Sequence, residues 1–117
     1  MPLLIKRAYE PPEDQDGKRV LVDRLWPRGL SKAHGKIDVW LKDIAPSTAL
    51  RQWFQHEEAK WPEFQRRYLA ELQENPCLDA LKALAGEGRV TLIYAAHDER
   101  HNNAVVLRDL LAKGTDR

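Results

Sequence analysis

The chain has 117 residues, of which 43% are hydrophobic and 32% are charged. This length fits a single domain, because one hydrophobic core typically forms in chains of about 100–150 residues. The formal net charge of +1 excludes a general polyanion binder, and the one cysteine, Cys77, excludes a disulfide framework. No apolar run approaches the roughly 20 residues of a membrane span, and the N-terminal residues lack a signal-peptide pattern. The sequence therefore predicts a soluble, cytoplasmic protein with no membrane association.

Two strands are expected near the N-terminus, over residues 1–9 and 19–26. Residues 10–18 between them contain two prolines, a glycine and several acids, which indicates a solvated loop. Because parallel neighbours need a connection of about a dozen residues or more, the shorter loop predicts that these strands pair antiparallel. Residues 28–36 form a loop with one helical turn, and alternating apolar residues favour a third strand over residues 37–46, with a short helix as the alternative.

The pattern changes to a helical period from Ser47, which is a suitable N-cap residue. The pairs Trp61-Pro62 and Asn75-Pro76 each open a further helix, since proline is favoured in the first turn. Residues 89–96 are almost entirely apolar and predict a strand buried on both faces. A polar loop and a last helix over residues 104–114 follow. Together these elements predict an α/β fold: a small three-layer sandwich with a mainly parallel central sheet of about four strands and helices on both faces.

The loop that follows the second strand is basic. Residues 18–36 contain six Lys and Arg against one acid, Asp23, a local charge of +5. Arginine can grip a planar anion such as a carboxylate or phosphate through two N–H groups, so Arg24 and Arg28 are candidate ligand-binding residues. Trp26 offers a face for stacking. The structural alternative is that Arg24 pairs with a nearby aspartate and that Trp26 fills the core.

The same loop contributes Gly29, which would let backbone N–H groups approach an anion, and Lys32, a further positive charge. Because ligands of α/β proteins bind beyond the carboxyl ends of the strands, this loop is expected to meet the loop after the last strand.

The loop over residues 97–103 carries ionisable and amide side chains before the last helix. His97 can exchange a proton near neutral pH, and Asp98 is a candidate acid or base. Asn102 and Asn103 are candidate binding residues, although Asp98 or Asn102 could instead cap the helix. His97 and His101 have the spacing of two metal ligands on a helix, but only Asp98 and Glu99 accompany them, and no metal site is expected.

Several familiar chemistries have no counterpart in the sequence. Cys77 lies near the start of a helix without a basic cradle, which indicates a packed residue rather than a nucleophile. There is no dinucleotide-binding motif, no phosphate-binding P-loop and no G-x-S-x-G motif. No cofactor is therefore expected.

Four stretches resemble a known family: RVLVDRLWPRGLSK (19–32), WLKDIAPSTALRQWFQH (40–56), WPEFQRRYLAEL (61–72) and VTLIYAAHDERHNNAVVLRDLL (90–111). The chain is similar to the YeaO-like bacterial proteins, grouped as domain of unknown function 488. The resemblance implies a small cytoplasmic α/β protein and leaves its activity open. It assigns Asp23 and Arg24 as a pair at a strand end, with Asp98 and Asn103 as their counterparts. Longer relatives carry a cysteine in the strand before the last helix, where this chain has Tyr94-Ala95-Ala96.

Three hypotheses follow for the function. The first is a protein that binds or acts on a small anionic ligand bearing phosphate or carboxylate, with Asp23, His97 and Asp98 as catalytic candidates and the remaining loop residues as ligand contacts. The second is a nucleic-acid-binding module that uses the basic segment 18–36. The third is a protein-interaction domain that uses the aromatic-rich segment 47–72. The sequence leaves the oligomeric state open.

Overall fold

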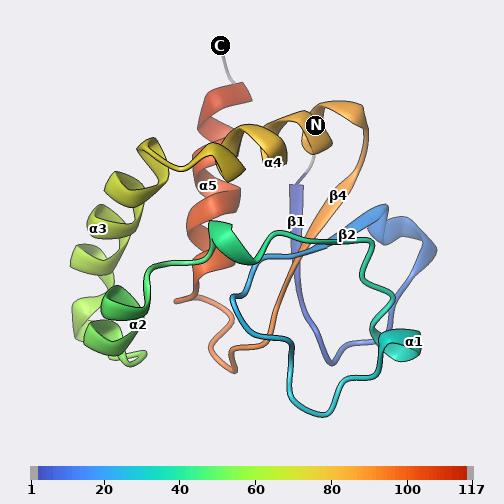
Figure 1. Ribbon diagram of the computed structural model, residues 1–117, viewed down its shortest axis with the longest axis horizontal. Coiled ribbons are helices and arrows are strands. Elements are labelled where there is room, and N and C mark those ends of the chain that lie inside the picture. Colours follow the sequence, from blue (N-terminus) through green and yellow to red (C-terminus); the bar gives the residue numbers. More distant parts are fainter. Residues whose placement is uncertain (1–2, 116–117) are drawn as a thin grey trace.

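The computed structural model describes residues 3–115, which form an α/β fold (Figure 1). The strands are β1 (Leu3–Arg7), β2 (Lys18–Leu21), β3 (Val39–Trp40) and β4 (Val90–Tyr94). The α-helices are α1 (Lys32–Gly35), α2 (Thr48–Phe54), α3 (Trp61–Gln73), α4 (Pro76–Glu87) and α5 (Asn103–Thr115). Short 3₁₀ turns are η1 (Asp14–Asp16), η2 (Lys42–Ile44) and η3 (Glu58–Lys60).

The four strands form one sheet in the order β1-β4-β2-β3, and every neighbouring pair is parallel. The predicted α/β class and the parallel four-stranded sheet are thus confirmed. The expected antiparallel pairing of the first two strands is wrong, because β4 lies between them. The connection from β1 to β2 contains no α-helix. It runs back along the sheet from the end of β1, and at the start of β2 the Lys18 N–H donates to the carbonyl of Arg89 at 3.0 Å.

The strands are shorter than expected, β2 and β3 most of all, and residues 1–2 of the first expected strand lie outside the described residues. β2 ends at Leu21 rather than Trp26, because the chain turns away at Asp23, whose side chain accepts a hydrogen bond from the Ala95 N–H. β3 has two residues at the edge of the sheet, and η2 replaces the rest of the expected strand. In η2 the buried Ile44 carbonyl accepts a hydrogen bond from the Tyr68 hydroxyl at 2.6 Å.

The helix starts follow the sequence closely. The Ser47 hydroxyl accepts a hydrogen bond from the Leu50 N–H at the start of α2, and Asn75 does the same for the Cys77 N–H at the start of α4. These caps satisfy N–H groups that have no partner within the helix.

The two faces of the sheet are covered by unequal layers. Helices α2 to α5 cover one face and gather at the left and top of Figure 1, whereas the one-turn α1 lies at the right. The main core contains side chains from the sheet and from these larger helices: Val20, Val22, Leu92, Tyr94, Phe64, Tyr68, Leu72, Leu81 and Leu107. On the second face, Leu21 and Ile93 pack against Trp26, Leu30 and Ile37 from the connection between β2 and β3.

Candidate functional site

A cavity of about 860 Å³ opens at the carboxyl ends of the strands, between the loop after β2 and helix α2. Of the residues predicted as a site, Asp23, Arg24, Trp26, Arg28, Asn102 and Asn103 line it. Residues from elements not assigned to the site by sequence line it as well, notably Tyr9, Arg51, Gln52 and His56.

Asp23 joins the two loops that meet at this cavity. One carboxylate oxygen accepts a hydrogen bond from the Ala95 N–H at 2.9 Å, and the other lies 3.3 Å from the Asn103 side-chain nitrogen. The same Asn103 nitrogen donates to the carbonyl of Val22 at 2.8 Å. Asp23 therefore links the end of β2 to the end of β4 and to the first residue of α5.

Burial raises the pKa of the Asp23 carboxyl, although the hydrogen bonds from Ala95 and Asn103 and the nearby charges of Arg51 and His56 partly oppose the shift. A carboxyl with a raised pKa binds its proton more readily in the folded state than in the unfolded state. Its contribution to stability is therefore fully present below the ordinary aspartate pKa and is lost as the pH rises through the folded pKa.

We expect this titration to appear in a comparison with Asp23→Asn, whose side chain does not ionise. The free energy of unfolding of the parent protein, minus that of the variant, should be larger at pH 4 than at pH 7. Urea denaturation of both proteins at the two pH values measures this difference. A difference that is constant, or that grows towards pH 7, would contradict the assignment.

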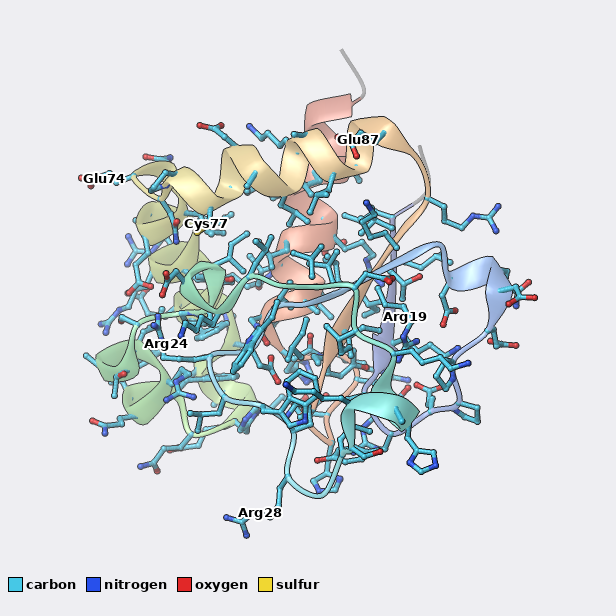
Figure 2. The ribbon with its side chains drawn as sticks, turned by 45° about the vertical axis from the view of Figure 1, so that its right-hand side comes forward. Arg19, Arg24, Arg28, Glu74, Cys77 and Glu87 are labelled. Atoms are coloured by element: carbon cyan, nitrogen blue, oxygen red, sulfur yellow. The ribbon has the colours of Figure 1, made fainter. Side chains whose placement is uncertain are left out.

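The arginines that line the cavity differ in how many hydrogen bonds and ion pairs their guanidinium groups make. Arg24 lies 3.4 Å from the carbonyl of Ala45 and 3.6 Å from the carboxylate of Asp43, both long distances, and its buried Nε has no hydrogen-bond partner. Among the described residues, Arg51 and Arg28 make no ion pair through their side chains. Figure 2 shows Arg24 close to the ribbon, whereas Arg28 lies at the outer tip of its loop and points away from the ribbon.

Aromatic side chains form much of the cavity wall. The Trp26 indole N–H donates to the carbonyl of Leu30 at 2.6 Å, and its ring meets Trp40 edge-on with centroids 5.6 Å apart. The hydroxyl of Tyr9 donates to the carbonyl of Arg28 at 2.9 Å. Trp26 therefore packs against the second-face core, the structural alternative considered for it, and it also lines the cavity.

His97 and Asp98 do not line the cavity. The Arg7 guanidinium donates to Nδ1 of the exposed His97 ring at 3.4 Å. Asp98 closes its own turn, because one carboxylate oxygen accepts from the Arg100 and His101 N–H groups and the other contacts the His101 ring at 2.9 Å. These hydrogen bonds lower the pKa of Asp98, the bond from the Arg100 N–H most of all.

Asn102 takes the capping role considered for it. Its side-chain oxygen accepts from the Val105 N–H at 3.0 Å, and its nitrogen donates to the carbonyl of Asp98 at 2.8 Å. Asn102 is buried at the cavity floor, and both ends of its amide are occupied by these structural bonds.

Gly29 and Lys32 lie outside the cavity lining. Gly29 has a φ of +78° in the turn closed by the Leu30 N–H on the carbonyl of Pro27, at 3.2 Å. Lys32 is the exposed first residue of α1.

Arg51 and His56 are the charged or ionisable side chains of the α2 segment that line the cavity without having been predicted from the sequence. The segment that contains them was interpreted through its apolar residues, and nothing in it marks its polar face as part of a site. One backbone feature distinguishes the segment: Gln55 and His56, just after α2, both have left-handed backbone conformations, with φ of 46° and 56°. Non-glycine residues held in this region often occur at functional sites.

Comparison with known proteins places the chain in a family. The family model described as "Inactive DUF488-N3 subclade" matches residues 2–117. The chain belongs to this DUF488 subclade. It is 44% identical over 112 residues to the uncharacterized protein YeaO of Escherichia coli strain K12, which covers 95% of this chain and 97% of YeaO. No solved structure matches the chain.

A second DUF488 relative is the uncharacterized protein Rv3073c of Mycobacterium tuberculosis strain H37Rv, 40% identical over 107 residues, 92% of this chain and 91% of Rv3073c. The YeaO-like resemblance is therefore confirmed over nearly the whole chain. Within residues 3–115, no group of three or more His, Cys, Asp or Glu side chains is arranged to hold a metal ion. No helix in that part of this family member is both long and apolar enough to cross a membrane.

Proposed function

We propose that the protein binds a small anionic ligand in this cavity and does not transform it. The observation that carries the proposal is the pair Arg24 and Arg51, which line one cavity. Arg51 makes no ion pair with the described residues, and Arg24 makes only a long one with Asp43, at 3.6 Å. Arginine N–H groups form strong, charge-assisted hydrogen bonds with carboxylate and phosphate. Arg28 also lines the cavity, but its side chain points outward from the tip of its loop (Figure 2).

The state of the acidic residues supports binding rather than catalysis. The Asp23 carboxylate accepts hydrogen bonds from the Ala95 N–H and the Asn103 side-chain amide. The Asp98 carboxylate accepts a hydrogen bond from the Arg100 N–H within its own turn. These contacts assign both carboxylates a structural role at the ends of the strands. The description of the family as inactive agrees with this reasoning.

The surface charges favour a small ligand over a nucleic acid that follows a basic stripe. Segment 18–36 does not form one basic surface, because Arg19 is buried against Asp16 whereas Arg24 lines the cavity. The aromatic residues of segment 47–72 give little support to an interaction face, since Phe54, Phe64 and Tyr68 lie in the main core. The cytoplasm is the compartment we expect, as the family resemblance implies.

Replacing Arg51 by Gln tests the proposal. We expect titration calorimetry with inorganic phosphate to show a dissociation constant about tenfold higher for Arg51→Gln than for the parent protein, because a hydrogen bond to a charged group contributes about 1.5–3 kcal/mol. The thermal midpoint should change little, because Arg51 is exposed and pairs with no acid among the described residues.

Arg66→Gln is the matched control, since Arg66 is an exposed arginine of α3 that pairs with Glu63 and lies outside the cavity. It should bind phosphate like the parent protein. Failure of the parent protein to bind phosphate saturably, or equal losses in the two variants, would overturn the proposal.

A further inference from the structure

The cavity is larger than a bare anion requires. Its volume of about 860 Å³ lies in the range of about 300–1,000 Å³ that holds whole small molecules rather than single ions. The arginines account for one part of such a ligand. The remaining volume must be filled by a part whose chemistry matches the rest of the wall.

That wall contains flat side chains from two separate parts of the chain. Tyr9 and Trp26 belong to the loops after β1 and β2, whereas Phe54 and His56 lie at the end of α2. Phe54 stacks on Phe64 with centroids 4.3 Å apart and meets the His56 ring at 5.5 Å. The exposed His56 ring therefore lies against buried aromatic side chains on this side of the cavity. Aromatic surfaces of this kind favour a flat ring, which stacks against them.

The charge at the cavity matches a dianion better than a monoanion. Three arginines and one carboxylate line it, an excess of two positive charges when His56 is neutral. A phosphate monoester carries a charge of about −1.5 to −2 at neutral pH, whereas a carboxylate carries −1.

The cavity also contains an unused acceptor. The side-chain nitrogen of Asn103 donates to Val22 and Asp23, but its side-chain oxygen accepts no hydrogen bond from the described residues. An N–H group on the edge of a ring can donate to such an oxygen, which gives the ring a polar contact as well as stacking.

We propose that the ligand combines a flat heteroaromatic ring with a phosphate monoester, as in a nucleoside monophosphate, either free or at the 5′ end of a nucleic-acid strand. The inference rests on the proposed function and specifies its ligand. The phosphate lies against Arg24 and Arg51, and the ring lies between the Tyr9–Trp26 wall and the Phe54–His56 wall.

The test measures the binding of four probes by the quenching of tryptophan fluorescence, with Trp26 in the cavity wall as the reporter. The probes are AMP, UMP, ribose 5-phosphate and adenosine. We expect at least one of the two nucleotides to bind about tenfold more tightly than ribose 5-phosphate, because stacking of a base on an aromatic wall has an effect of this size. It should also bind more tightly than adenosine, which lacks the phosphate.

Two variants separate the ring from the phosphate. Tyr9→Leu keeps an apolar side chain at a half-exposed position, and it should weaken nucleotide binding severalfold more than ribose 5-phosphate binding. Trp53→Leu is the control, because Trp53 lies outside the cavity and contacts Lys60 and Arg67. It should leave nucleotide binding unchanged.

The outcomes separate this inference from the proposed function. If ribose 5-phosphate binds as tightly as both nucleotides, the proposed ring site is wrong, but the proposed anion site is supported. If no phosphate compound binds, the ring site and the anion site are both wrong. A 5′-phosphorylated oligonucleotide that binds like the free nucleotide identifies a strand end as the source, and preference for the free nucleotide identifies the small molecule. Binding of oligonucleotides regardless of the 5′ phosphate would overturn the inference.

Discussion

Asp16→Ala should lower the free energy of unfolding by about 3–5 kcal/mol, the usual effect of removing one partner from a buried ion pair. The Arg19 and Asp16 side chains are only 4% and 5% exposed, and they meet at 2.6 Å. Asp16 also accepts hydrogen bonds from Lys6 and from the Glu13 N–H. Without the carboxylate, the Arg19 guanidinium is left buried with a hydrogen bond to the carbonyl of Gly35 and no counter-charge. Chemical denaturation at pH 7 measures the loss.

The pH dependence gives this prediction a second readout. Burial alone would raise the pKa of Asp16, but the bonds from Glu13, Lys6 and Arg19 outweigh it and lower the pKa. A lowered pKa stabilises the fold above the ordinary aspartate pKa, and this stabilisation is lost as the pH falls through the folded pKa. The difference between the parent protein and Asp16→Ala should therefore shrink in acid, opposite in direction to the Asp23 effect.

Asp14→Ala is the matched control for Asp16→Ala. Asp14 is an exposed aspartate in the same 3₁₀ turn, and its side chain makes no hydrogen bond or ion pair with the described residues. Its replacement should leave the free energy of unfolding within the error of the parent value. Equal losses in the two variants would mean that the turn itself, not the buried pair, is responsible.

Gly17→Ala should lower the free energy of unfolding by about 3 kcal/mol, since it combines backbone strain with a steric clash. Gly17 has a φ of +67°, and an added Cβ would collide with the carbonyl oxygen of Arg89 and lie 2.8 Å from its Cβ. Both obstacles adjoin the start of β4, so the clash would push apart the strands that Gly17 and Arg89 precede. Thermal or chemical denaturation measures the change.

Gly29→Ala separates strain from collision. Gly29 also has a positive φ, +78°, but nothing lies within 4 Å of the position that an added methyl group would occupy. The cost should be about 1 kcal/mol, from conformation alone. If Gly17→Ala costs no more than Gly29→Ala, the close approach to Arg89 does not constrain the fold.

Local signals in the sequence predicted most of the elements. Ser47 and Asn75 cap helices as their residue types suggest, and the apolar segment 89–96 contains the buried strand β4. The order of the strands could not be predicted in this way, because it depends on β4, which is distant in sequence, entering between β1 and β2. The length of the loop between β1 and β2 lets the chain return along the sheet, but it does not indicate whether these two strands are neighbours.

Most of the lining residues that follow β2 were predicted from the sequence, whereas Tyr9 after β1 and the residues of the α2 segment were not. Asp23, Arg24 and Trp26 follow β2 directly, and the carboxyl ends of parallel strands are the expected place for a site. Arg51 and His56 reach the same cavity only because α2 packs beside that edge. The segment's apolar period predicts its buried face but not what its polar face meets.

Trp26, in the loop after β2, packs against Leu21 and Ile93 on the second face of the sheet and also forms part of the cavity wall. Any local opening that lets water reach those two side chains therefore dismantles the wall at the same moment. Under the proposed function, molecules with the loop open would not bind the ligand, and the apparent affinity would equal the intrinsic affinity reduced by the fraction of closed loops. A bound ligand would in turn keep the second face closed, and occupancy of the cavity would protect a core that the ligand does not touch.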